Sequence, residues 1–115
     1  MRLNGLTILG QRADYLRAAS ARRVSTPGFT LQYRQRKEGE AEGIRVGFTC
    51  SKKVGNAVAR NRAKRRLREI ARMVLPESGR DGFDYVLIGR REVTAGRDFS
   101  ELKADLKRAL EKAHP

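Results

Sequence analysis

The sequence contains no tryptophan, one cysteine and one histidine, so side chains that often perform catalysis or bind metals are scarce. The single cysteine, Cys50, excludes an internal disulfide and fits a reducing compartment, and we expect it to be a buried small hydrophobe. The single histidine, His114, lies at the end of the sequence, where chains tend to fray, and no Cys and His set has zinc spacing. We therefore expect no catalytic residue, no metal ligand and no cofactor bound by the protein itself.

Acidic residues are few, and long hydrophobic runs are absent. No two carboxylates form a pattern typical of an acid–base pair, and no GxxxxGK[ST] phosphate loop occurs, so we expect no small-molecule substrate. No apolar stretch approaches 18 residues, and residues 1–9 lack the features of a signal peptide, so we expect no membrane partner and a cytoplasmic location. The length of 115 residues and the hydrophobic content of 39% predict one domain over residues 1–115 with a modest core.

Positive charge is what the sequence has in excess. It carries 26 Lys and Arg against 13 Asp and Glu, a net charge of +13 with an isoelectric point near 11.0. Such a balance points first to a nucleic-acid partner. The charge is concentrated between Lys52 and Arg72, where nine residues are basic and only Glu69 is acidic.

This basic stretch is predicted to form a helix from Asn56 to Leu75. At 100° per residue, one side of the helix is apolar and would pack on a core, whereas the remaining arc is cationic with Asn61 within it. Arg60 alone lies towards the apolar side, near the first turn, where its long side chain can reach past the helix end. The apolar side consists of Ala59, Ala63, Leu67, Ile70, Ala71 and Val74.

The start of this helix has an unusual charge. Asn56 is a good N-cap and Gly55 allows a tight entry, but the first turn has no acid, and Lys52 and Lys53 stand just upstream. Cations near a helix N-terminus oppose the macrodipole by roughly 0.3–1 kcal/mol each, whereas free N–H groups there attract phosphate. A solvated face without a partner is the alternative, but like charges four residues apart repel each other. We therefore predict a surface that binds a polyanion.

The other elements follow from alternation, turn residues and capping. Residues 1–8 are expected to be loosely held, and Asp98 with Glu101 has capping-box spacing for a last helix. The strand at 44–50 is expected to pair antiparallel with the strand at 29–34 through a hairpin loop at 35–43. The predicted elements are a helix at 11–20, strands at 22–26, 29–34, 44–50 and 85–88, a break at 76–82, an irregular segment at 91–97 and a helix at 99–113. This order predicts an α+β or α/β domain with one small sheet, in which the strand at 85–88 is central and covered on both faces.

Residues 46–69, VGFTCSKKVGNAVARNRAKRRLRE, closely resemble a known family motif. The bacterial ribonuclease P protein subunit has the pattern SKK-x-GNAV-x-RNR-x-KR-x-x-RE, and every element of it is present here. The likeness extends more weakly over the helix with Asp14 and Tyr15, the strand at 29–34, residues 84–91 and the last helix.

The resemblance implies a fold and an activity. The fold would be an α-β sandwich of the α+β class, with three helices and a four-stranded sheet in the order αβββαβα. A left-handed βαβ crossover, rare for parallel strands, would pass through the basic helix. The protein would bind the ribonuclease P RNA subunit and precursor tRNA and aid removal of the 5′ leader. Catalysis would belong to the RNA and its Mg²⁺ ions.

The resemblance and the cationic arc also imply site residues. The expected RNA-binding residues are Lys52, Lys53, Arg60, Asn61, Arg62, Lys64, Arg65, Arg66, Arg68 and Arg72; Asn61 has a structural role as its equal alternative. The expected leader cleft has Tyr15 for stacking, with plain core packing as its alternative, and includes Gln32, Arg90 and Arg91. Ala19 and Gln32 stand where other members have aromatic residues, which leaves more of leader recognition to charge.

Three other functions were weighed. A ribosomal or architectural RNA-binding protein would also be small and basic, but would not change precursor-tRNA cleavage at low magnesium. A free-standing nuclease would need a carboxylate or histidine cluster, which the sequence lacks. A helix-turn-helix DNA-binding protein is disfavoured, since the basic helix lies between strands rather than after a short partner helix.

Overall fold

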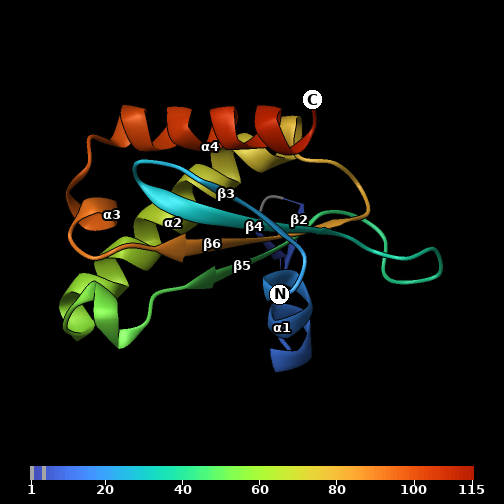
Figure 1. The fold of residues 1–115 in the computed structure, drawn as a ribbon, viewed down its shortest axis with the longest axis horizontal. Coiled ribbons are helices and arrows are strands. Elements are labelled where there is room, and N and C mark those ends of the chain that lie inside the picture. Colours follow the sequence, from blue (N-terminus) through green and yellow to red (C-terminus); the bar gives the residue numbers. More distant parts are fainter. Residues whose placement is uncertain (1, 4) are drawn as a thin grey trace.

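A mixed sheet lies at the centre of the computed structural model, which describes residues 2–3 and 5–115 (Figure 1). The elements in chain order are β1 (Arg2–Leu3), β2 (Leu6–Ile8), α1 (Arg12–Ala19), β3 (Arg22–Ser25), β4 (Phe29–Gln35), β5 (Arg45–Thr49), the 3-10 helix η1 (Lys52–Val54), α2 (Ala57–Ser78), β6 (Phe83–Gly89), α3 (Val93–Gly96) and α4 (Phe99–Ala113). The α+β class and the order αβββαβα of the main elements are confirmed.

The sheet has six strands in the order β1-β2-β5-β6-β4-β3, not the four that the resemblance implied. The two additional strands come from the start of the chain, which we had expected to be loosely held. β2 pairs in parallel with β5, and Leu6 is almost completely buried. The prediction was therefore wrong for residues 6–8, whereas residues 1 and 4 lie outside the described residues.

The predicted hairpin between β4 and β5 is also wrong. β6 lies between these two strands, antiparallel to β4 and parallel to β5. The connection at 36–44 is held instead by Arg36 and by backbone bonds to the turn before β6, such as Arg36 N–H to Gly82 O at 2.8 Å. β6 is the central apolar strand that the sequence predicted. Because β5 and β6 are parallel neighbours joined through α2, the βαβ crossover is present; its left hand stays a prediction.

α2 follows its predicted pattern at the start and exceeds it at the end. The side-chain oxygen of Asn56 accepts the N–H of Ala59 at 2.9 Å, which confirms the N-cap. The helix continues through Pro76 to Ser78, beyond the predicted end at Leu75. A proline this close to the end removes few helical hydrogen bonds, and Gly79 N–H closes the last turn on Leu75 O at 2.8 Å.

The two faces of the sheet differ in character. α2 and α4 cover one face, and α1 lies on the other (Figure 1). The α2/α4 face contains the main core, in which Phe29, Leu31, Tyr85 and Leu87 pack against the apolar sides of both helices. α4 has the predicted bounds, and the Asp98 carboxylate accepts the N–H of Glu101 at 3.2 Å. The segment at 91–97 is not irregular throughout, since it contains α3.

The α1 face is more polar. Because side chains alternate along a strand, the residues on this face follow from the strand register. They include Arg23, Ser25, Thr30, Gln32, Arg34, Arg45, Gly47, Thr49, Asp84, Val86 and Ile88. Only Val86 and Ile88 among them join the small apolar cluster with Leu9, Tyr15 and Ala18. The sheet therefore separates an apolar core from a polar face that α1 covers in part.

Candidate nucleic-acid interface

The cationic arc of α2 is exposed, whereas its apolar side is buried. Ala63, Leu67, Ile70, Ala71 and Val74 are buried in the core, as the periodicity predicted. Ahead of the helix, Lys52 and Lys53 lie exposed in η1, whose first turn is held by Ser51 Oγ accepting the N–H of Lys53. Gly55 then takes a φ of 145°, in the region that favours glycine, so that the chain can turn from η1 into α2.

A shallow hollow lies on the exposed side of α2. Asn61, Lys64, Arg65 and Arg68 line it together with Val58, which is 75% exposed. The guanidinium of Arg68 stands 5.8 Å from the centre of the Phe48 ring, an arrangement that favours a fixed position for the cation. The Asn61 side chain is exposed, makes no hydrogen bond within the described residues and faces this hollow.

Three of the predicted RNA-binding arginines are used by the protein itself. Arg62 donates from Nε to Ala95 O at 3.1 Å, which ties α2 to α3. Arg66 donates to Arg97 O and lies over the Phe99 ring, and its burial lowers its pKa. Arg72 pairs with Glu69, which raises the pKa of Arg72. Their charge therefore contributes less to an external ligand than their position on the helix suggests.

The remaining cations are available. Within the part of the chain that the structure describes, Lys52, Lys53, Arg60, Lys64 and Arg65 make neither an ion pair nor a side-chain hydrogen bond. We call these five residues, together with Asn61 and Arg68, the α2 cationic surface. Seven of the ten predicted RNA-binding residues thus have side chains without ion pairs or hydrogen bonds in the described residues, and four of them, Asn61, Lys64, Arg65 and Arg68, line one hollow.

Tyr15 lies on the other side of the molecule, between α1 and the sheet. Its ring packs directly on Gly47, where a Cβ atom would stand 2.6 Å from Tyr15 Cε1. Its hydroxyl donates to Leu9 O at 3.4 Å, and the side chain stays partly exposed. Tyr15 therefore packs against the protein and still offers an edge to the solvent, so both of its predicted roles fit the geometry.

Gln32, Arg90 and Arg91 do not form one cluster. Gln32 is buried on β4 in the same register row as Val86 and Gly47, so it shares the α1 face with Tyr15. Arg90 reaches this face, since its Nη2 donates to Thr30 Oγ1 at 3.1 Å. Arg91 is largely exposed in the turn before α3, 3.9 Å from Glu92. The structure thus places Tyr15, Gln32 and Arg90 on one face and leaves Arg91 outside it.

Sequence reasoning missed several polar residues of the same face. Arg23, Ser25, Thr30 and Thr49 lie on it and remain at least partly exposed. The alternation of β3, β4 and β5 held this information. The alternation alone does not show which residues of different strands lie side by side. That depends on the position of β6 between β4 and β5, which the sequence did not reveal.

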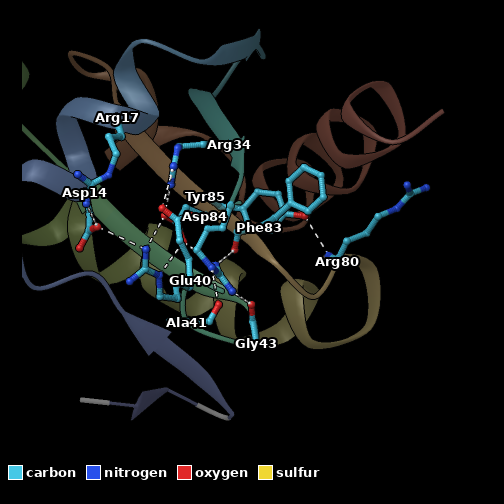
Figure 2. A network of polar contacts seen from close by, with 12 residues as sticks. Asp14, Arg17, Arg34, Glu40, Ala41, Gly43, Arg80, Phe83, Asp84 and Tyr85 are labelled. Atoms are coloured by element: carbon cyan, nitrogen blue, oxygen red, sulfur yellow. Dashed lines mark hydrogen bonds and ion pairs between the residues drawn. The ribbon is translucent and has the colours of Figure 1, made fainter. Parts of the chain in front are cut away.

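Sequence reasoning also missed a buried arginine network around Asp84 (Figure 2). Arg45 donates to both carboxylate oxygens of Asp84, at 2.7 and 2.8 Å, and Arg36 donates to Oδ1 at 2.7 Å. Arg45 also lies 3.4 Å from Asp14 on α1, and Arg34 lies 3.8 Å from Asp84. The network therefore joins α1 to three strands and leaves these arginines without free charge for a ligand.

Groups suited to catalysis or metal binding are sparse. Within residues 2–3 and 5–115, no cluster of three or more His, Cys, Asp or Glu could hold a metal ion. The buried acids Asp14, Asp84 and Asp105 are all paired with arginine. Cys50 is half-buried beside the core, and its burial raises the pKa of its thiol. In the same described part of the chain, no helix is both long and apolar enough to cross a membrane.

The fold and the surface together define a small basic α+β protein with a cationic helix on one side and a polar sheet face on the other. Residues 4–114 match the Ribonuclease P family. The chain belongs to the ribonuclease P protein family.

Several relatives support this assignment. The chain is 64% identical to the ribonuclease P protein component of Ruegeria pomeroyi over 111 residues, which cover 96% of this chain and 89% of the relative. It is 50% identical to that of Gluconacetobacter diazotrophicus over 91% of this chain and 89% of the relative. The solved RNase P protein of Staphylococcus aureus superposes with a TM-score of 0.73 at 26% identity, covering 93% of this chain and 94% of that one. That of Thermotoga maritima gives 0.72 at 25% identity, with 97% and 94% covered.

Proposed function

We propose that this chain binds the RNA subunit of ribonuclease P and the 5′ leader of precursor tRNA, and so aids removal of the leader. The observation that carries the proposal is the α2 cationic surface, whose six basic side chains make no ion pair within the described residues. Relatives named as ribonuclease P protein components support the same function.

The α2 cationic surface is the proposed contact with the RNA subunit. Its cations extend from η1 along the exposed side of α2, and the hollow lined by Asn61, Lys64 and Arg65 offers polar groups beside them. Arginine can hold a phosphate with two N–H groups, whereas lysine acts as a point charge. Each phosphate neutralised would contribute about −0.7 to −0.9 to the slope of log K against log salt.

The α1 face is the proposed contact with the leader. Tyr15 offers a ring edge, Gln32 and the hydroxyl residues offer hydrogen-bonding groups, and Arg90 offers a cation beside Thr30. Since Ala19 and Gln32 are not aromatic, stacking on this face would rest mainly on Tyr15. Leader binding by this protein would accordingly depend more on charge and hydrogen bonds than on stacking.

Phosphodiester cleavage is assigned to the RNA. Two-metal hydrolysis needs positioned divalent cations, and RNA phosphates can hold Mg²⁺ in place. The acids of this chain are a poor fit for that task, because its buried carboxylates already pair with arginine. The protein would instead supply positive charge that lowers the repulsion between two polyanions. We place this activity in the cytoplasm, where tRNA precursors are processed.

The test is reconstitution with the cognate RNA subunit, using Lys64 and Arg65 changed together to alanine. Arg62 is left intact because it ties α2 to α3. We expect affinity for the RNA subunit to fall at least tenfold and the salt slope to flatten by about 1.4–1.8, with the fold unchanged. The matched control is Lys107 and Lys112, exposed on α4, changed together to alanine.

The same assay separates the proposal from its rivals. With wild-type protein, precursor-tRNA cleavage at low magnesium should rise, whereas an architectural RNA-binding protein would leave cleavage unchanged. Tyr15→Leu should weaken binding of precursor tRNA more than binding of the RNA subunit. Equal RNA affinity in the α2 double variant and the α4 control would remove the α2 cationic surface from the proposal.

A further inference from the structure

A pocket lies beside the end of α4, at the end of the sheet where β4 finishes and β6 begins. Its volume is about 580 Å³, within the range of small-ligand sites. It is lined by the start of β3, the end of β4, the start of β6, Arg80 and residues 113–115. Tyr33 and Phe83 face the α2/α4 side of the sheet, opposite the α1 face, to which Arg34 among the lining residues belongs. No lining residue belongs to the α2 cationic surface.

Aromatic rings form the wall of this pocket. The His114 ring meets Phe83 edge to face, with ring centres 4.6 Å apart and an interplanar angle of 85°. Tyr33 stands 6.1 Å from the same imidazole. Tyr33, Phe83 and His114 are only partly buried, so their rings remain accessible beside the open pocket. Aromatic surface of this kind can stack with a nucleic-acid base of any sequence.

The hydrogen bonds behind this wall fix the state of the imidazole. The hydroxyl of Tyr85 accepts the backbone N–H of Arg80 at 2.9 Å and lies 2.6 Å from His114 Nε2. Tyr85 is completely buried, so its hydroxyl proton has His114 Nε2 as its acceptor. Burial raises the pKa of Tyr85 to about 12, and burial together with Arg80 lowers the pKa of His114. Both causes favour the neutral imidazole, and donation from the Tyr85 hydroxyl to Nε2 corresponds to the tautomer with its proton on Nδ1, where it can donate to a ligand.

Unpaired cations flank the same pocket. Within the described residues, the side chains of Arg22 and Arg80 make neither an ion pair nor a hydrogen bond, and both residues are exposed. The third arginine of the pocket, Arg34, is held by Glu40 at 3.1 Å. Two guanidinium groups are thus free to bind an anion beside the aromatic wall.

We propose that this pocket binds one unpaired RNA nucleotide. Tyr33 and Phe83 would hold the base, the imidazole N–H and the Gln35 amide would bind its edge, and Arg22 with Arg80 would hold its phosphate. Unpaired guanidinium groups around accessible rings are the combination that single-stranded RNA sites use. An acidic peptide would use the cations but not the rings, and inorganic phosphate would use the cations alone.

The experiment titrates full-length protein with adenosine 5′-monophosphate and follows the NMR signals of Tyr33, Phe83 and His114. Inorganic phosphate and a tetraglutamate peptide serve as the comparison ligands. We expect adenosine monophosphate to bind at least fivefold more tightly than either. Arg80→Gln should weaken both adenosine monophosphate and phosphate, whereas Tyr33→Leu should weaken adenosine monophosphate alone.

The controls keep the test independent of folding and of the α2 cationic surface. Lys112→Gln removes a charge from α4 outside the pocket and should leave binding unchanged. Arg80→Gln changes an exposed side chain whose backbone N–H still reaches Tyr85, so this variant should fold even if Tyr33→Leu does not. Equal affinity for all three ligands, or no change of the three ring signals at millimolar adenosine monophosphate, would overturn the proposal. Neither result would affect the proposed RNA-subunit contact.

Discussion

Two groups of basic residues in this molecule show opposite uses of the same charge. Arg36 and Arg45 lie around the buried carboxylate of Asp84, and every charge there has a partner within the chain. Lys64 and Arg65 lie exposed on α2 and make no ion pair in the described residues, since the nearby acid Glu69 pairs with Arg72. The difference follows from burial, because a buried charge without a partner is costly, whereas water solvates an exposed one.

The comparison shows which basic residues serve the fold and which are open to a ligand. Composition alone makes all 26 Lys and Arg appear equivalent. Their partners separate them: Arg36 also donates to Ala41 O and Phe83 O, both at 2.8 Å, and so fixes the connection before β5. The following predictions test this separation, from the largest expected effect to the smallest.

Removing the buried carboxylate should have the largest effect. Asp84→Asn leaves Arg36 without a counter-charge and Arg45 with Asp14 alone, and loss of one partner of a buried ion pair costs about 3–5 kcal/mol. Urea unfolding should show a loss of that size in the free energy of unfolding. Asp81→Asn, in the exposed turn before β6, is the control and should change it little. A loss below about 1 kcal/mol would mean that the Asp84 network does not differ from surface ion pairs.

Removing the neutral, buried hydroxyl of Tyr85 should lower the free energy of unfolding by an intermediate amount that depends on pH. Tyr85→Phe removes the bonds to Arg80 N–H and His114, which should cost about 1–3 kcal/mol at pH 7. The folded pKa of Tyr85 is raised to about 12, above the ordinary value of about 10, so the unfolded chain releases this proton first. Wild-type stability should therefore fall by about 2 kcal/mol between pH 10 and 12 because of this group, and the variant should lack that fall.

The stability difference between wild type and Tyr85→Phe, measured by urea unfolding at each pH, isolates this group from the lysines that titrate in the same range. A difference that stays constant from pH 9 to 12 would show that the phenol is not held in its neutral form by burial.

Removing an exposed cation of α2 should change stability least, and it should raise stability rather than lower it. Lys64 has Arg60 and Arg68 four residues away on either side, and like charges at this spacing repel by a few tenths of a kcal/mol. Lys64→Ala should therefore slightly raise the melting temperature at low salt, with a smaller gain at high salt. Lys107→Ala on α4 is the matched control. Lys107 has one basic neighbour, Lys103, and one acidic neighbour, Glu111, at this spacing, so repulsion and attraction largely cancel. Equal salt dependence in both variants would contradict the repulsion on α2.

The local features of α2 and α4 were predictable from sequence because they depend on neighbouring residues. The apolar side of α2, the N-cap at Asn56 and the capping box of Asp98 all involve positions within a few turns of each other. The family motif lies in the same continuous stretch. The α2 cationic surface was therefore available from sequence, apart from the ties of Arg62 and Arg66 to α3 and the chain before α4.

Pairing across long sequence distances was not predictable in the same way. No feature of the sequence near β4 and β5 shows that β6 inserts between them. The alternating pattern of β4 and β5 fits direct pairing in a hairpin and pairing of both strands with β6 equally well. The Asp84 network and the pocket around His114 both depend on this insertion. A terminal histidine was for the same reason predicted to fray, whereas the structure holds it against Phe83 and Tyr85.

The central position of β6 also affects the order in which the chain can fold. β4 and β5 are made first but are not hydrogen-bonded to each other, so each has an unpaired edge until residues 83–89 arrive. Such edges can associate with other chains, and contacts between distant residues form slowly. The positive charge of α2, synthesised between β5 and β6, would make unfinished copies repel one another during that interval.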